Sequence, residues 1–142
     1  MRHTGFNTRC VHAAHAPDAA SGAIAEPIHL TTTFERDPDG AYSRGYRYSR
    51  EGTPNRAALE NCVAALEGGV GAVAFASGLA ANMAVLQLLQ AGDHLVAPLE
   101  AYYGTLKQLG EYTGERGVAV DSVDFSNAAS VKAAVNRRTR LV

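Results

Sequence analysis

The chain has 142 residues, 46% of them hydrophobic, which is enough for one ordinary folded domain with an apolar core. Its 13 basic and 14 acidic side chains leave a net charge of -1, which excludes a global attraction to nucleic acid or to an anionic membrane. The longest apolar run, near residues 79–89, is about half as long as the ~20-residue helix that spans a bilayer.

Residues 1–53 show neither a helical nor a strand period. Irregular segments of this length are uncommon in compact domains and are usually functional or disordered. Ile28, Leu30 and Phe34 have nearly the spacing of a strand, and three tyrosines follow between residues 42 and 48, so the segment is too apolar for ordinary disorder. We therefore expect an extended arm that packs against a second copy of the chain.

Residues 54–142 alternate between helical and strand-like patterns. Thr53 and Pro54 are typical of a helix start, and Gly68 and Gly69 of a helix end. The expected helices are 54–67, 79–90, 105–115 and 127–137, and the expected strands are 72–76, 95–97, 118–123 and 141–142. This alternation indicates βαβ units and a mainly parallel sheet, hence the α/β class. Because the sequence ends as the last strand begins, we expect a truncated domain.

The stretch Ser77-Gly78 joins an expected strand to an expected helix. The first turn of a helix carries unpaired backbone N–H groups and a partial positive charge, which suit an anion. Gly78 also lacks the Cβ atom that would obstruct a phosphate group. The alternative is structural, in which Ser77 only caps the helix and Gly78 only makes a turn.

Two better-known motifs do not fit this region. The glycines at 68–71 precede their expected strand, whereas a dinucleotide fingerprint follows one. Phe75 and Leu79 stand where a GxSxG nucleophile elbow has glycines.

Tyr102 and Tyr103 follow the strand expected at 95–97. They should lie at the carboxyl edge of the parallel sheet, where ligands bind in such folds. A tyrosine ring there could stack on a flat cofactor, and its hydroxyl could exchange a proton. The alternative is a partly buried aromatic residue that opens the next helix.

The tract "SRGYRYSREG" contains two tyrosines interspersed with three arginines. Such a tract could bind a phosphate, or it could form a small RNA-binding segment with stacking rings and phosphate-seeking arginines. The net charge of -1 and the lack of any common RNA-binding motif argue against RNA.

Cysteines and histidines give no sign of a metal site or a disulfide framework. Cys10 and Cys62 are isolated, which favours a reduced, cytoplasmic location, and the first residues lack the apolar segment of a secretory signal. The histidines have no ligand spacing, and we expect all five in loops or at the surface: His3, His12, His15, His29 and His94.

Several segments in the same order resemble one family, the pyridoxal 5'-phosphate (PLP) enzymes of cysteine and methionine metabolism. They are "TRCVHA", "GAIAEPIHLTTTF", "YRYSREGTPNRAALE", "ALEGG", "AFASGLAA", "GDHLVAP" and "EAYYGT". The family includes cystathionine γ-synthase, the cystathionine lyases, methionine γ-lyase and the O-acylhomoserine sulfhydrylases. The resemblance implies a PLP-dependent aminotransferase-like (fold type I) domain, of which residues 54–142 form the first part.

The resemblance also implies site residues. Backbone amides of Gly78 and Leu79 would hold the cofactor phosphate at the turn that Ser77 shapes. Tyr48 and Arg50 would reach the same phosphate from a neighbouring subunit. Tyr102 would stack on the pyridine ring and transfer protons; Tyr103, which directly precedes a glycine, is the second choice.

The sequence departs from the family pattern at several positions. Residues 53–56 read Thr-Pro-Asn-Arg where Asn-Pro-Thr-Arg is usual, and His29 stands where an aromatic residue is common. Leu79 replaces a frequent methionine, Tyr103 replaces a glycine, and Glu100 stands at the acidic position.

The family's Schiff-base lysine has no counterpart in the chain. Only Lys107 and Lys132 are present; Lys107 is spaced to pair with Glu111 on a solvated helix face, and Lys132 lies in a polar stretch. We therefore expect the N-terminal portion of a homotetrameric enzyme, inactive by itself. The complete enzyme would catalyse β- or γ-elimination, or γ-replacement, on small amino-acid substrates.

Overall fold

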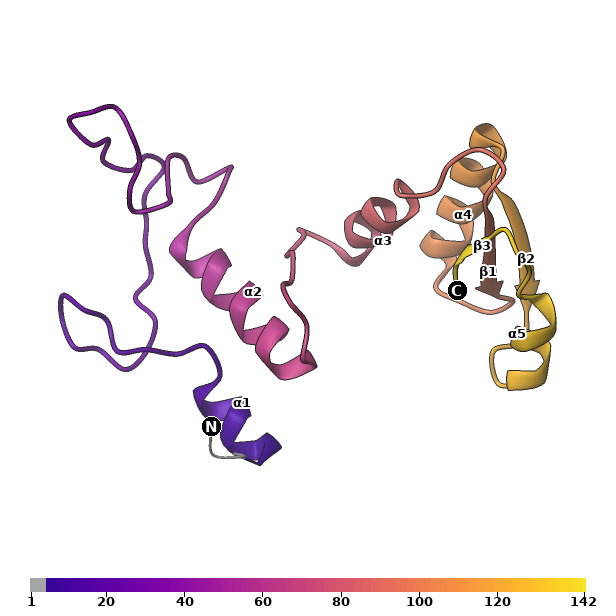
Figure 1. Ribbon diagram of the computed structural model, residues 1–142, viewed down its shortest axis with the longest axis horizontal. Coiled ribbons are helices and arrows are strands. Elements are labelled where there is room, and N and C mark those ends of the chain that lie inside the picture. The colour runs from indigo at the N-terminus through magenta and orange to yellow at the C-terminus, as the bar shows by residue number, and fades with distance from the viewer. Residues whose placement is uncertain (1–4) are drawn as a thin grey trace. The chain divides into compact units, whose positions relative to one another are not determined.

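The structure is a computed structural model that describes residues 5–142 (Figure 1). The chain divides into two compact units, the first reaching to Ala74 and the second running from Phe75 to Val142. The first contains α1 (Phe6–His12) and α2 (Pro54–Glu67). The second contains α3 (Gly78–Leu86), β1 (His94–Pro98), α4 (Tyr103–Arg116), β2 (Ala119–Val123), α5 (Ala128–Ala134) and β3 (Thr139–Leu141).

The first unit is largely irregular, as expected for the segment that precedes α2. Among its described residues the only strand-like pairing before α2 is a single antiparallel bridge between Thr33 and Tyr48. The short helix α1 was not predicted: it has seven residues, and Gly5 at its start gives no side-chain cap. No described residue of this unit is fully buried.

Helix α2 begins and ends where the sequence predicts. The Thr53 side chain accepts a hydrogen bond from the Arg56 N–H at 3.1 Å, and Gly68 ends the helix in the left-handed region with φ of 70°. Asn55 joins this helix to the irregular segment, because its Oδ1 accepts from the His29 N–H at 2.9 Å and its Nδ2 donates to the Pro27 carbonyl at 2.7 Å. The Thr-Pro-Asn order therefore has a structural use.

The strand predicted at residues 72–76 is absent, so that prediction was wrong. Val73 is 72% exposed and Phe75 45% exposed. A strand is stabilised by hydrogen bonds to a neighbouring strand. Among the described residues this stretch has no such neighbour, and the Ala74 N–H donates instead to Oε1 of Glu60 at 2.9 Å.

The second unit is built on a three-stranded parallel sheet in the order β2-β1-β3 (Figure 1). In register, His94 pairs with Ala119 and Pro98 with Val123, and β3 lies on the other side of β1. The central strand is the most buried, and the core consists of Leu86, Leu89, Leu95, Ala97 and Val118. The predicted α/β class with parallel βαβ connections is confirmed.

Helix lengths in the second unit differ modestly from the expected ones. Helix α3 ends at Leu86, four residues before the predicted end, and α4 begins two residues early at Tyr103. Asn127 caps α5 by accepting from the N–H groups of Ala129 and Ser130, and α5 ends at Ala134. Helix ends fray and are the least predictable part of a pattern.

The expectation for histidines was wrong at His94, which is only 2% exposed. Its Nδ1 lies 2.8 Å from Thr139 Oγ1, and its Nε2 lies 3.2 Å from Asp121 Oδ2, although the latter geometry falls short of a hydrogen bond. His94 therefore contacts both neighbouring strands. The described histidines in the first unit are exposed, as expected, and His3 lies outside the described residues.

No helix within residues 5–142 is long and apolar enough to cross a membrane. No cluster of three potential metal ligands occurs in the part of the chain that the structure describes. Cys10 and Cys62 are both free.

Candidate functional site

The first turn of α3 provides two available backbone donors. Ser77 caps the helix: its Oγ accepts from the Ala80 N–H at 3.2 Å and its carbonyl accepts from the Ala81 N–H at 3.1 Å. The N–H groups of Gly78 and Leu79 have no acceptor among the described residues. Two free donors at the positive end of a helix dipole can bind an anion.

Gly78 is not required by the local backbone. A Cβ atom placed on it would meet no heavy atom within 4 Å, and its φ is not in the left-handed region. Ser77 and Gly78 are exposed. The space in front of this turn is therefore open to a ligand.

Tyr102 lies beside the same turn. Its carbonyl accepts from the Thr105 N–H at 2.8 Å, which fixes the start of α4. A Cβ atom on Gly104 would lie 2.7 Å from Cε1 of Tyr102 and 3.1 Å from Cδ1 of Leu79. The glycine therefore lets the Tyr102 ring and the Leu79 side chain approach one point.

Two side-chain hydrogen bonds fasten α4 to α3. Asn82 Nδ2 donates to Thr105 Oγ1 at 3.0 Å, and Gln108 Nε2 donates to the Leu79 carbonyl at 2.9 Å. Sequence reasoning missed both amides. The signal that could have found Asn82 is its position as the one polar side chain within the apolar helix "GLAANMAVL".

Tyr102 and Tyr103 are both largely exposed, at 72% and 75%. Tyr103 is the first residue of α4, whereas the ring that crowds Gly104 beside Leu79 is that of Tyr102. This proximity favours Tyr102 as the stacking residue, and the assignment stays a prediction.

Glu100 and Asp124 line a hollow beyond the carboxyl ends of β1 and β2. Its volume is about 480 Å³, and its lining residues are Pro98, Leu99, Glu100, Asp124, Phe125 and Ser126. The Ser126 hydroxyl and N–H donate to the Asp124 carboxylate at 2.7 and 2.8 Å, and these bonds hold the pKa of Asp124 below its ordinary value. Asp124 is a second acidic residue at this edge, and no sequence pattern singled it out.

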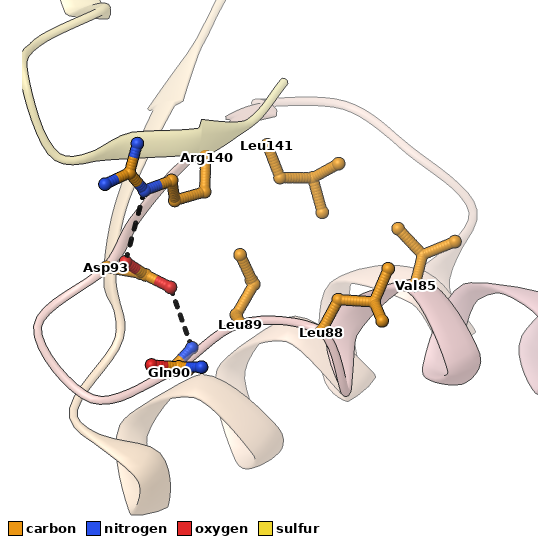
Figure 2. Close-up of a pocket in the computed structure, with 7 residues that line it drawn as sticks. All are labelled: Val85, Leu88, Leu89, Gln90, Asp93, Arg140 and Leu141. Atoms are coloured by element: carbon orange, nitrogen blue, oxygen red, sulfur yellow. Dashed lines mark hydrogen bonds and ion pairs between the residues drawn. The ribbon is translucent and has the colours of Figure 1, made fainter.

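A second hollow, shown in Figure 2, has a volume of about 330 Å³. It is lined by Val85, Leu88, Leu89, Gln90, Asp93, Arg140 and Leu141. Asp93 accepts from the Gln90 N–H at 2.8 Å and lies 3.6 Å from Nε of Arg140. Asp93 directly precedes β1, so this hollow lies at the amino-terminal end of that strand, away from the edge where ligands of parallel sheets bind. None of the predicted site residues lines it.

Tyr48 and Arg50 are neighbours in the first unit. The Arg50 guanidinium carbon lies 4.7 Å from the centroid of the Tyr48 ring. The nearby Arg47 pairs with Glu51, whose pKa is held below its ordinary value by hydrogen bonds from Arg47. Arg50 has no carboxylate partner among the described residues, so its guanidinium is available to another anion.

The two lysines lie on exposed helix faces. Lys107 Nζ is 3.8 Å from Glu111 Oε1, which confirms the predicted pairing on α4, and both side chains are more than half exposed. Lys132 is in the last turn of α5 and is exposed.

Residues 7–142 match the sequence signature of the Cys/Met metabolism PLP-dependent enzymes. The chain is 40% identical over 140 residues to a cystathionine gamma-synthase of Mycobacterium leprae, and 39% identical over 139 residues to a cystathionine beta-lyase of Lactococcus lactis. Each alignment covers 98% of this chain and 36% of the relative.

Solved structures of enzymes from the same family resemble this chain. A crystal structure of metB from Corynebacterium glutamicum superposes with a TM-score of 0.87 at 38% identity, over 98% of this chain and 37% of that one. Cystathionine gamma-lyase from Lactobacillus plantarum gives a TM-score of 0.83 at 36% identity, over 97% of this chain and 36% of that one.

The chain therefore belongs to the Cys/Met metabolism PLP-dependent enzyme family. It spans little more than a third of the length of these relatives. The residues present fit the cofactor of the family: two free N–H groups and an open turn suit a phosphate, and an aromatic ring lies near the Leu79 side chain.

Proposed function

We propose that this chain forms the phosphate-binding and ring-stacking part of a PLP-dependent trans-sulfuration enzyme. The complete enzyme would catalyse β- or γ-elimination, or γ-replacement, on sulfur amino acids or O-acylhomoserine. The observation that carries the proposal is the position of the Tyr102 ring beside Leu79, on a helix whose first two N–H groups have no acceptor among residues 5–142.

The phosphate is held by the α3 turn. The N–H groups of Gly78 and Leu79 donate to its oxygens, and hydrogen bonds to an anion are roughly twice as strong as those between neutral groups. Ser77 shapes the turn, because its side chain satisfies the Ala80 N–H and leaves the two preceding donors free. Gly78 allows the phosphate to approach the backbone closely.

Tyr102 contacts the pyridine ring in this proposal. Its ring would stack on the pyridine ring of the cofactor, and its phenolic hydroxyl would take part in proton transfer. When bound, PLP acts as an electron sink for carbanions at Cα and Cβ of an amino acid. Tyr103 remains the alternative stacking residue.

A neighbouring copy of the chain completes the phosphate site in this proposal. Its Tyr48 hydroxyl and Arg50 guanidinium contact the phosphate, and residues 1–53 form the arm that brings them there, while residues 54–142 begin the cofactor domain. Arg50 suits this role because it has no carboxylate partner within the described residues. The assembly is a dimer of dimers in the cytoplasm, where Cys10 and Cys62 stay reduced.

RNA binding by the tract is the weaker alternative in this proposal. Arg44 and Arg47, the other arginines of the tract, are engaged by Glu35 and Glu51. A single available guanidinium suits one phosphate group better than an extended phosphate backbone.

Neither lysine of the chain lies at the proposed cofactor site. Lys107 is paired with Glu111 on an exposed helix face, and Lys132 lies on α5. We therefore propose that these 142 residues alone turn over no substrate. Borohydride reduction with PLP followed by peptide mapping checks this: stoichiometric labelling of one lysine, together with activity, would contradict it.

The phosphate proposal is tested by comparing pyridoxine 5'-phosphate with pyridoxine by calorimetry. Neither ligand has the aldehyde that reacts with surface lysines. Charge-assisted hydrogen bonds are worth roughly 1.5–3 kcal/mol each, so the phosphate ester should bind at least about tenfold more tightly. Equal affinities for the two ligands would refute the proposed site.

A further inference from the structure

Each side-chain amide between α3 and α4 ends on a residue that adjoins one half of the proposed site. Asn82 reaches Thr105, whose N–H holds the Tyr102 carbonyl at 2.8 Å. Gln108 reaches the carbonyl of Leu79, whose N–H is one of the two free donors. The phosphate turn and the tyrosine are thus linked through side chains as well as through packing.

The Gln108 amide is not what stability alone would select. Asn82 is the one polar side chain of α3 and lies at the surface. The Oε1 atom of Gln108 is buried and has no hydrogen-bond partner among the described residues, which costs free energy that an apolar side chain would avoid. Local departures of this kind are typical of residues that serve a site.

We propose that Asn82 is a positioning residue, supported by Gln108, that fixes the distance between the Tyr102 ring and the N–H groups of Gly78 and Leu79. This inference rests on the proposed function, because it takes those groups to contact the ring and the phosphate of one ligand. A ligand with both parts benefits from the fixed spacing. Inorganic phosphate needs only the two N–H groups.

The contrast between the two ligands provides the experiment. Inorganic phosphate and pyridoxine 5'-phosphate are titrated into the full chain and into three variants, Asn82→Leu, Asn82→Gln and Gln87→Ala. The glutamine keeps a side-chain amide that can donate to Thr105 Oγ1 and adds no charge near the anion site. Gln87 is an exposed amide at the C-terminal end of α3 and serves as the matched control.

We expect Asn82→Leu to lower the affinity for pyridoxine 5'-phosphate by about fivefold, the equivalent of one hydrogen bond. The affinity for inorganic phosphate should change by less than about twofold. Asn82→Gln and Gln87→Ala should resemble the parent chain with both ligands. Thr105→Val removes the same hydrogen bond from the other side. Combined with Asn82→Leu, it should add little to the loss, because both changes break one interaction.

Three results separate the possibilities. Parent-like binding of pyridoxine 5'-phosphate by both Asn82→Leu and Thr105→Val overturns the positioning role. An equal loss for both ligands, or an additive loss in the double variant, also overturns it, because that pattern reports general loosening of α3. If the parent chain binds neither ligand at the α3 turn, the proposed function fails first, and this inference falls with it. If Asn82→Leu does not fold, the Thr105→Val comparison decides alone.

Discussion

Gly78 and Gly104 are both at the candidate site, but for different physical reasons. A Cβ atom on Gly78 would meet open space, whereas one on Gly104 would lie 2.7 Å from the Tyr102 ring. The first glycine leaves room for a ligand, and the second leaves room for the side chain that contacts it. Alanine substitutions should therefore separate binding from folding.

Gly78→Ala should reduce phosphate binding without destabilising the chain. Alanine at the first helical position clashes with nothing within 4 Å, so the free energy of unfolding should change by less than about 0.5 kcal/mol. The added methyl group stands where the phosphate approaches. Denaturant unfolding measures the stability of the variant, and a phosphate titration measures its affinity. Unchanged phosphate affinity would count against the proposed phosphate site at this turn.

Gly104→Ala should displace the Tyr102 ring, because no Cβ fits 2.7 Å from Cε1. We expect weaker binding of pyridoxine 5'-phosphate and shifted Tyr102 ring signals in NMR spectra. The control is Gly110→Ala, in the same helix, where a Cβ meets no atom within 4 Å. That change should raise the free energy of unfolding by about 0.5–1 kcal/mol and leave binding alone. Identical ring signals in Gly104→Ala and the parent would contradict the packing described here.

At the scale of elements, the sequence predicts what depends on local chemistry. The Thr53 cap, Pro54 and Gly68 define α2, and the cap at Ser77 defines the start of α3. The apolar run at 72–76 has the composition of a strand, but a strand needs a partner, and composition does not supply one. Local signals therefore predicted the helices better than this strand.

The burial of His94 inside the sheet is another feature that local sequence signals could not predict. Its neighbours come from strands that are distant in sequence, so spacing rules for metal ligands or loops could not place it. Nδ1 accepts from Asn136 Nδ2 at 3.1 Å, since Asn136 Oδ1 is already used by the Arg138 N–H. Nε2 then carries the hydrogen atom and faces Asp121 on β2.

His94→Leu should therefore destabilise the second unit. The change leaves the Thr139 hydroxyl and the Asn136 amide without this partner, at a cost of about 1–3 kcal/mol. Asp121→Asn should cost less than about 1 kcal/mol, because the Asp121 side chain is 59% exposed. Denaturant unfolding measures both. A larger loss from the Asp121 change would show that the contact between His94 Nε2 and Asp121, and not the hydrogen bonds at Nδ1, holds the strands.

On the scale of the whole molecule, the first unit lacks a core of its own. None of its described residues is buried, and Ile24, Ile28 and Leu30 are 84%, 80% and 94% exposed. Apolar side chains in such numbers are typical of a surface that is covered in an assembly. The sequence predicted the irregular and apolar character of this segment, but not which surface covers it.

We therefore expect the chain to self-associate through this segment. The double variant Ile28→Asp, Leu30→Asp should shift the sedimentation distribution toward the monomer, because burying two carboxylates in an apolar contact is costly. Val70→Asp is the control, since Val70 is fully exposed outside the segment. A distribution unchanged by the double variant, or equally changed by Val70→Asp, would contradict association through residues 24–30.

The proposed site requires the α3 turn and Tyr102 to hold one phosphorylated pyridine together. An NMR titration of the labelled chain with pyridoxine 5'-phosphate tests this. The largest shifts should occur at the amide groups of Gly78 and Leu79 and at the Tyr102 ring, with one common dissociation constant. Shifts confined to the hollow between Val85 and Arg140 (Figure 2), or to the Tyr102 ring without the two amides, would contradict it.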